Sequence, residues 1–267
     1  MNKPLAFLII AALFVAVCYV AYNSYVKSKV PRSLIGETYK SESIKGKYLK
    51  YRYFIPEQKT EKLPLVIFFH GAGERGNDNQ SQINFHSLEW IDPIVQNENP
   101  CYVIIPQCEK YCYWVNIQFS SFPFFHYKVD SLPESDELKL FMLLLDEFVQ
   151  KNNVDENRIY LVGFSMGSTA VWDLISRHPH KFAATINMAG TSDTSKANLI
   201  THIPIKVFNG EHDPYMPLQL NTEMCNKIKE HGGNVHLTIY KGVGHDCVNL
   251  AYNTPGLFNW LFSQKKQ

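Results

Sequence analysis

The stretch Arg158-Ile-Tyr-Leu-Val-Gly-Phe-Ser-Met-Gly167 is an apolar run that ends in the pattern G-x-S-x-G. The apolar residues predict a strand at 158–162, and the residues after the serine predict a helix at 166–178. A serine at a sharp turn between a strand and a helix projects its hydroxyl above the edge of the sheet, and small residues two positions to either side relieve the crowding. The stretch therefore predicts that Ser165 is a nucleophile. The alternative is a serine that only caps the following helix.

The chain on either side of this turn alternates predicted strands with predicted helices. Several of the strands are continuous apolar runs, which is typical of parallel strands that are buried on both faces. The alternation predicts an α/β fold with a mostly parallel central sheet and helices on both faces, formed by residues 33–267 as one large domain. The other predicted strands are 48–55, 65–69, 102–105, 183–188, 205–208 and 235–240, and the other predicted helices are 135–151, 218–231 and 246–262.

The composition is that of a globular protein. Of 267 residues, 45% are hydrophobic and 19% are charged, which excludes a disordered, collagenous or multi-span membrane chain. Lysine and arginine number 26 against 25 acidic residues, so the formal net charge is +1. Such a balance provides no cationic field for a phosphate backbone, and we expect no nucleic-acid partner.

A second motif competes with the serine turn. Gly71, Gly73 and Gly76 spell G-x-G-x-x-G directly after the strand 65–69, where a dinucleotide-binding fingerprint would lie. That fingerprint needs its third glycine inside a helix, whereas the residues that follow, 77–80, are typical of a loop. Two rival functions therefore remain beside a hydrolase: a nucleotide-dependent oxidoreductase that uses this loop, and a membrane-tethered binding module without turnover.

If Ser165 is a nucleophile, an acid and a histidine should follow later in the chain, each on a loop after a later strand. Asp213 follows the strand 205–208 and His245 follows the strand 235–240. Loops at the carboxyl ends of parallel strands meet at one edge of the sheet, so these three residues can converge. Glu211 is a competing carboxylate. His70, which ends the strand before the glycine loop, is predicted to be a structural hydrogen-bond partner.

Together these motifs resemble the α/β-hydrolase superfamily, and within it compact esterases similar to feruloyl and acetylxylan esterases and to predicted peptidase-like carboxylesterases. The resemblance spans nearly everything after about residue 36. It implies an α/β-hydrolase fold, ester hydrolysis without cofactor or metal, and an oxyanion hole formed by the backbone N–H groups of Ala72 and Met166. The segments that carry it are 63–76, 106–108, 163–167, 210–214 and 242–246.

The substrate is less defined than the chemistry. Residues 108–127 contain eight aromatic side chains, a high density for a loop. We expect Trp114 to face the pocket, where its ring could hold a sugar or an aromatic acyl group, while the phenylalanines pack underneath. The alternative is that the rings form a satellite core. The expected substrate is a small-molecule or carbohydrate ester, and the oligomeric state stays open.

The first 32 residues form a separate segment. Residues 5–22 are 18 consecutive uncharged residues, enough to cross a bilayer as a helix, and the signals for cleavage are poor. An uncleaved membrane anchor is therefore favoured over a buried core helix. The basic residues Lys27, Lys29 and Arg32 do not clearly direct export. We expect a membrane-anchored protein with an extracytoplasmic catalytic domain, or a secreted or periplasmic one if the segment is cleaved.

The cysteines do not form a framework. One of six, Cys18, lies in the apolar run, which leaves an odd number that cannot all pair internally. Cys108 and Cys112 are close enough in sequence for a small disulfide loop in an oxidising compartment. No spacing matches a standard zinc site, so we expect no metal.

Overall fold

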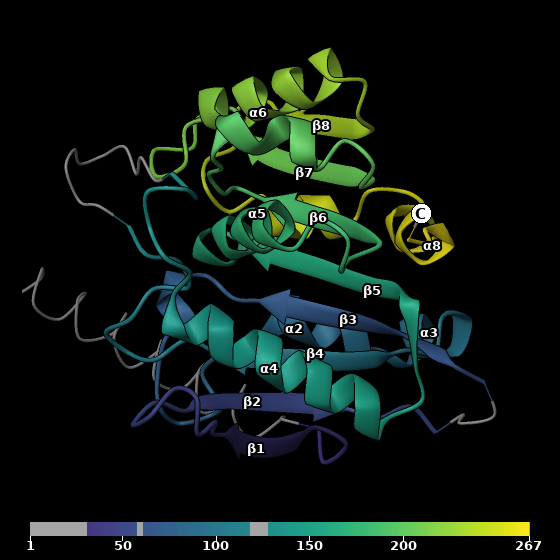
Figure 1. Ribbon diagram of the computed structural model, residues 1–267. Helices are drawn as coiled ribbons and strands as arrows, with labels where there is room; N and C mark the ends of the chain where they lie inside the picture. Colours follow the sequence, from purple (N-terminus) through teal and green to yellow (C-terminus); the bar gives the residue numbers. More distant parts are fainter. Residues whose placement is uncertain (1–30, 58–60, 118–127, 267) are drawn as a thin grey trace, which may run out of the picture.

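A computed structural model describes residues 31–57, 61–117 and 128–266. An eight-stranded sheet crosses the molecule in the order β1-β2-β4-β3-β5-β6-β7-β8 (Figure 1). The pairs from β4 to β8 are parallel, whereas β2 is antiparallel to both β1 and β4. The predicted α/β fold with a mostly parallel sheet is confirmed. The strands are β1 Ile35–Tyr39, β2 Leu49–Phe54, β3 Leu63–Phe69, β4 Tyr102–Gln107, β5 Val154–Phe164, β6 Ala184–Met188, β7 Ile205–Gly210 and β8 Val235–Tyr240.

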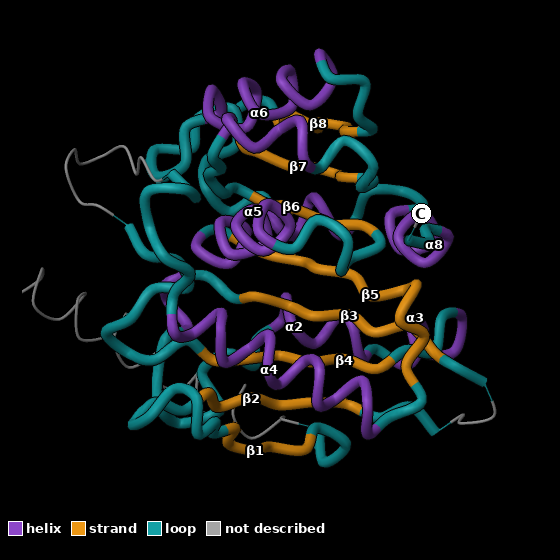
Figure 2. Tube along the Cα trace, in the orientation of Figure 1, coloured by secondary structure: helices purple, strands orange, loops and turns teal. Residues whose placement is uncertain are grey.

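Helices cover both faces of this sheet (Figure 2). On one face pack α4 (Asp136–Lys151), α5 (Met166–Arg177) and α6 (Leu218–Glu230). The segment that contains α2 (Phe85–Leu88), together with α7 (Val248–Tyr252) and α8 (Leu257–Ser263), packs on the other face, and α3 (Pro93–Glu98) follows α2 in the chain. Each face therefore has its own hydrophobic core, and the sheet separates the two.

Strand β3 shows how the sequence builds both cores. Leu65, Ile67 and Phe69 point into the core beneath α4 and α5, and Val66 and Phe68 point into the opposite core. All five side chains are almost completely buried. Because helices cover both sides, the strand needs apolar residues at successive positions rather than at alternate ones.

The last predicted helix, 246–262, is wrong as a single element. The structure has α7 (Val248–Tyr252) and α8 (Leu257–Ser263) with a break between them. Pro255 has no backbone N–H to continue the first helix, and Gly256 adopts a left-handed φ of 72°. The edge strand β1 was not predicted, because it is short and four of its five residues are exposed.

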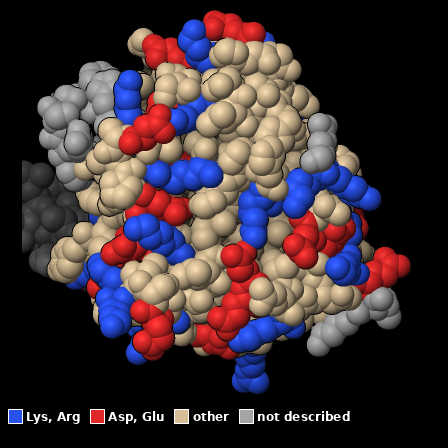
Figure 3. All heavy atoms as spheres, in the orientation of Figure 1, with Lys and Arg blue, Asp and Glu red and all other residues tan. Residues whose placement is uncertain are grey.

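Three further predictions concern the membrane anchor, the disulfide and the surface charge. The apolar run 5–22 lies outside the described residues, and among the described ones no helix is long and apolar enough to cross a membrane. Cys108 and Cys112 are both free thiols, so the disulfide considered for them is not formed. On the face drawn in Figure 3, basic and acidic side chains are interspersed.

Candidate active site

Ser165 lies at the turn between β5 and α5, as the sequence predicted. Its backbone has φ 54° and ψ −120°, a left-handed conformation that an ordinary residue adopts only under constraint. A Cβ at Gly163 would lie 2.4 Å from the carbonyl oxygen of Gly167, and a Cβ at Gly167 would lie 2.0 Å from that of Phe69. Only glycine fits at both positions, which explains the G-x-S-x-G pattern in steric terms.

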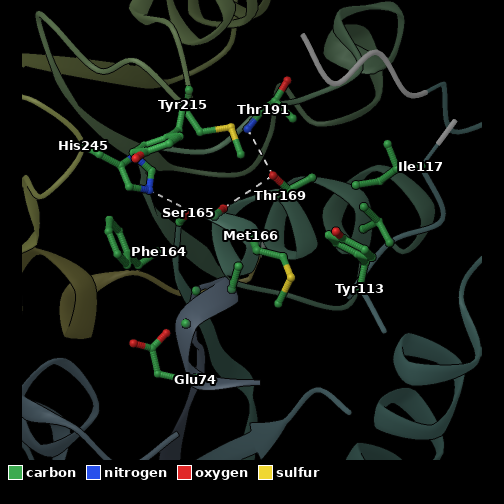
Figure 4. Close-up of a pocket in the computed structure, with 15 residues that line it drawn as sticks. Glu74, Tyr113, Ile117, Phe164, Ser165, Met166, Thr169, Thr191, Tyr215 and His245 are labelled. Carbon is green, nitrogen blue, oxygen red and sulfur yellow. Dashed lines mark hydrogen bonds between the residues drawn. The ribbon is translucent and has the colours of Figure 1, made fainter. Parts of the chain in front are cut away.

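The three predicted partners converge at the carboxyl edge of the sheet. The Nε2 atom of His245 lies 2.8 Å from the Oγ atom of Ser165, and its Nδ1 atom lies 2.8 Å from an oxygen of Asp213. The first of these hydrogen bonds is drawn in Figure 4. Because the Asp213 carboxylate can only accept when ionised, Nδ1 carries the proton and Nε2 is free to accept the serine proton.

Asp213 is the carboxylate that contacts the histidine. Its side chain is completely buried, and its second oxygen accepts hydrogen bonds of 2.9 Å from the backbone N–H groups of Tyr215 and Met216. Glu211 instead accepts a hydrogen bond of 2.9 Å from the backbone N–H of Gly242 and is partly exposed. Both carboxylates join the loops after β7 and β8, but only Asp213 reaches the imidazole.

Two aromatic rings flank the imidazole of His245. The ring of Phe164 lies 5.1 Å from it, centroid to centroid, and that of Tyr215 lies 5.2 Å away in an edge-on arrangement. Contacts on two sides restrict the ring to the plane in which it can bond to both Ser165 and Asp213. Neither aromatic residue was predicted, because nothing local in the sequence distinguishes them.

The two residues predicted for an oxyanion hole both line the pocket beside Ser165. Ala72 is the first residue of a short 3₁₀ helix, η1 (Ala72–Glu74), and Met166 is the first residue of α5. The first N–H groups of a helix have no acceptor within the helix, so both are available to a ligand. Their part in catalysis stays a prediction.

His70 supports this loop from below, and its predicted structural role is confirmed. Its Nδ1–H donates to the carbonyl oxygen of Gly71 at 2.6 Å, and its Nε2 accepts from the backbone N–H of Cys108 at 3.0 Å. The side chain is completely buried, and burial lowers its pKa to about 4. The neutral imidazole therefore ties the end of β3 to the end of β4.

The pocket above Ser165 has a volume of about 420 Å³ and mostly apolar walls. One end is formed by Tyr113 and Ile117, and the other by Phe164 and His245 (Figure 4). The carboxyl group of Glu74, which sequence reasoning missed, also faces this space. The remaining wall residues are Gly71, Ala72, Gly73, Val115, Ser165, Met166, Thr169, Thr191, Tyr215 and Met216.

Trp114 does not line the pocket, and the prediction that it faces the substrate is wrong. Its side chain is completely buried and its indole N–H donates to the carbonyl oxygen of His70 at 3.1 Å. Its ring packs edge-on against Phe69 at 5.0 Å. Tyr113 and Val115, its neighbours in sequence, point into the pocket instead. The phenylalanines at 119–125 lie outside the described residues.

The glycine loop does not form a dinucleotide site. Within the described range 61–117, the helix after β3 has only three residues, and Gly76 lies beyond its end. The phosphate-binding fingerprint requires a longer helix that contains the third glycine and packs on the strand.

One cluster outside the pocket has the residue types of a metal site. Three possible ligand atoms lie within 4.8 Å of one another there, one each from Glu109, Cys112 and Glu137. Burial, followed by the neighbouring carboxylates, raises the pKa of the Cys112 thiol to about 12. The thiol is therefore protonated at neutral pH and is a poor ligand as it stands.

Comparisons with known proteins identify a family and a shared fold. A family described as Phospholipase/Carboxylesterase matches residues 51–251. A thermostable esterase superposes with a TM-score of 0.80 and 33% identity, covering 87% of this chain, and the chain spans 63% of that protein's length. Two further esterases share the fold. A ferulic acid esterase has a TM-score of 0.61 and 15% identity, and the match covers 85% of this chain and 98% of that one. The esterase PE8 has a TM-score of 0.56 and 16% identity, and the match covers 86% of this chain and 97% of that one.

No curated protein matches the chain in sequence. The family match nevertheless runs from β2 to α7 and includes the serine turn and both loops that carry its partners. The mostly parallel sheet, the strained serine between β5 and α5, and the order serine, aspartate, histidine agree with that match. The chain therefore belongs to the phospholipase/carboxylesterase family of α/β-hydrolases.

Proposed function

We propose that this protein is a serine carboxylesterase that hydrolyses carboxylic esters through an acyl-enzyme intermediate. The observation that carries the proposal is the unbroken chain of hydrogen bonds from Asp213 through His245 to Ser165, each 2.8 Å long. It ends in an apolar pocket beside two helix N-termini. Nucleophile, base and candidate oxyanion donors thus meet around one point in space.

The reaction follows from this arrangement. Ser165 attacks the ester carbonyl carbon while His245 removes the hydroxyl proton, and the N–H groups of Ala72 and Met166 stabilise the resulting oxyanion. The imidazolium, held by Asp213, then donates its proton to the leaving alcohol as the bond from the carbonyl carbon to the alcohol oxygen breaks. A water molecule, deprotonated by His245, hydrolyses the acyl-enzyme and restores the serine.

The walls of the pocket indicate what kind of acyl group would bind. Tyr113, Val115 and Ile117 form an apolar end that suits a short aliphatic or an aromatic acyl chain. As substrates we propose carbohydrates that carry such acyl groups in ester linkage. Since one structural neighbour is a ferulic acid esterase, esters of aromatic acids belong in the test panel.

Covalent labelling tests the proposal. We expect a fluorophosphonate to label the wild-type protein at Ser165, and Ser165→Ala to lose both labelling and ester hydrolysis, the latter by on the order of 10⁴-fold, without unfolding. Ser263→Ala, which changes an exposed serine in α8, is the matched control and should retain both. If a dinucleotide protected the protein and the fluorophosphonate did not label it, the oxidoreductase would be supported instead. If neither effect were seen, the binding module without turnover would remain.

We also propose that residues 5–22 attach the enzyme to a membrane, which rests on the sequence alone. The full chain should stay in the membrane fraction after an alkaline carbonate wash, and a chain that begins at Ser33 should be released and active. A mature amino terminus between residues 18 and 30 in protein isolated from cells would show cleavage and a secreted or periplasmic enzyme.

A further inference from the structure

Glu74 places an acidic group in the same pocket as the nucleophile. A Cβ at Gly71 would lie 3.3 Å from Oε2 of Glu74, 3.4 Å from the ring of Phe164 and 3.5 Å from the Cβ of Ser165. The carboxyl group therefore lies across a single glycine from the reacting serine. Among the fifteen residues that line the pocket, Glu74 is the only one with a carboxyl group.

The carboxyl group of Glu74 is partly buried and lies among hydrogen-bond donors. Burial, the largest effect, raises its pKa, and hydrogen bonds from the backbone of Glu74 itself, the Asn84 side chain and the backbone of Gly71 act in the opposite direction. Asn84 is itself held, because its side chain accepts a hydrogen bond of 3.2 Å from the backbone N–H of Ser87 at the start of α2. Among the described residues, no lysine or arginine forms an ion pair with Glu74.

Glu74 lies on the side of the pocket where the leaving alcohol of the ester should bind. His245 must protonate the leaving alcohol, so the alcohol lies on the side of Ser165 that faces His245 and Phe164. In Figure 4, Tyr113 and Ile117 form the opposite end of the pocket, which leaves that end for the acyl group. Glu74 and Phe164 both lie within 3.4 Å of a Cβ placed at Gly71. Glu74 is therefore on the same side of the pocket as Phe164, which is the side of the alcohol.

We propose that Glu74 is a specificity residue that accepts hydrogen bonds from free hydroxyl groups of the leaving alcohol, so that the enzyme favours esters of polyhydroxylated alcohols such as sugars and glycerol. This inference rests on the proposed esterase function. Whether ionised or protonated, the carboxyl group offers an acceptor oxygen to a hydroxyl. An alcohol without hydroxyl groups would cover the carboxyl group without offering it a further hydrogen-bond donor in place of water, which disfavours that alcohol.

Two butyrate esters that differ only in the alcohol test the proposal. The measured quantity is the ratio of kcat/KM for glyceryl monobutyrate to kcat/KM for butyl butyrate. We expect Glu74→Ala to lower this ratio at least tenfold, and Glu74→Gln to lower it less, because the amide keeps one acceptor oxygen. Glu98→Gln, which changes an exposed carboxylate at the end of α3, is the matched control and should keep the wild-type ratio.

Three outcomes would overturn the proposal alone, and a fourth would overturn the proposed function with it. An unchanged ratio in both Glu74 variants would mean that the carboxyl group does not contact the alcohol. Equal losses on both esters with a lowered Tm would mean a structural role. A larger loss on butyrylcholine than on glyceryl monobutyrate would make Glu74 a cation site. If the wild type hydrolyses no ester at all, the proposed function fails together with this inference, whereas the other outcomes leave the esterase assignment intact.

Discussion

Asp213 lies where its carboxylate can orient the imidazole of His245. One of its oxygens contacts Nδ1 of His245, and the other is saturated by the backbone N–H groups of Tyr215 and Met216. We predict that Asp213→Asn lowers kcat by on the order of 10³- to 10⁴-fold, because an amide can donate to Nδ1 and select the tautomer in which Nε2 carries the proton. Steady-state kinetics on a short-chain ester would measure it.

Glu211 is the matched control for this prediction. It lies two residues away on the same loop, and its contact is a hydrogen bond from the backbone N–H of Gly242. We expect Glu211→Gln to change kcat less than about fivefold, since an amide oxygen can still accept that bond. If Glu211→Gln proved more damaging than Asp213→Asn in variants of equal stability, the triad assignment would be wrong.

The residues that sequence reasoning could predict share one property. Ser165, Asp213 and His245 each lie on a turn or loop that follows a recognisable strand, so the local pattern and the order along the chain identify them. Glu74 also follows such a strand, but its orientation depends on Asn84, a contact that no local pattern encodes. Trp114 was predicted wrongly because sequence alone does not say which of several adjacent aromatic residues faces inward.

At the scale of elements, the segment after β4 supports the pocket from behind. Trp114 packs against Phe69 on β3, its N–H bonds to the carbonyl oxygen of His70, and its own carbonyl accepts from the hydroxyl of Ser135, the cap of α4. The indole thus joins β3, the loop and α4. It belongs to the core, although it was expected in the pocket.

We predict that Trp114→Ala costs about 3 to 5 kcal/mol of stability, the usual range for removing a buried large aromatic ring, and lowers activity on all esters alike. Trp114→Phe should recover part of the loss, because it keeps the contact with Phe69 but not the N–H donor. Urea denaturation and kinetics on a short aliphatic and an aromatic ester would measure both effects. Unchanged stability with a selective rise in KM for the aromatic ester would return the residue to the substrate site.

The limits of prediction at this scale are also physical. Strands β3 to β7 were recognisable because burial on both faces requires apolar residues at successive positions, whereas the edge strand β1 pairs on one side only and is mostly exposed. The helix predicted over 246–262 has apolar residues on both sides of Pro255 and Gly256, but this pair divides it. There, backbone chemistry outweighed periodicity.

At the scale of the whole molecule, His70 makes folding sensitive to acid. Its ordinary pKa is 6.5, and burial lowers the pKa to about 4 in the folded state. Between these two values the unfolded chain binds a proton that the folded chain does not, so stability is complete above the upper value and falls as pH drops towards the lower one. The imidazole cannot accept the proton without losing its hydrogen bond from the N–H of Cys108.

We predict that this single residue accounts for about 2 kcal/mol of the stability lost between about pH 7 and pH 5. Urea denaturation of wild type and His70→Asn at both pH values would measure it. The variant should be less stable at pH 7, because the link between β3 and β4 is weakened, yet it should lose about 2 kcal/mol less on acidification, since asparagine does not titrate. Equal losses in the two proteins would mean that His70 is not the group whose protonation destabilises the fold, and that another buried base, such as His86 with its lowered pKa, carries the acid sensitivity.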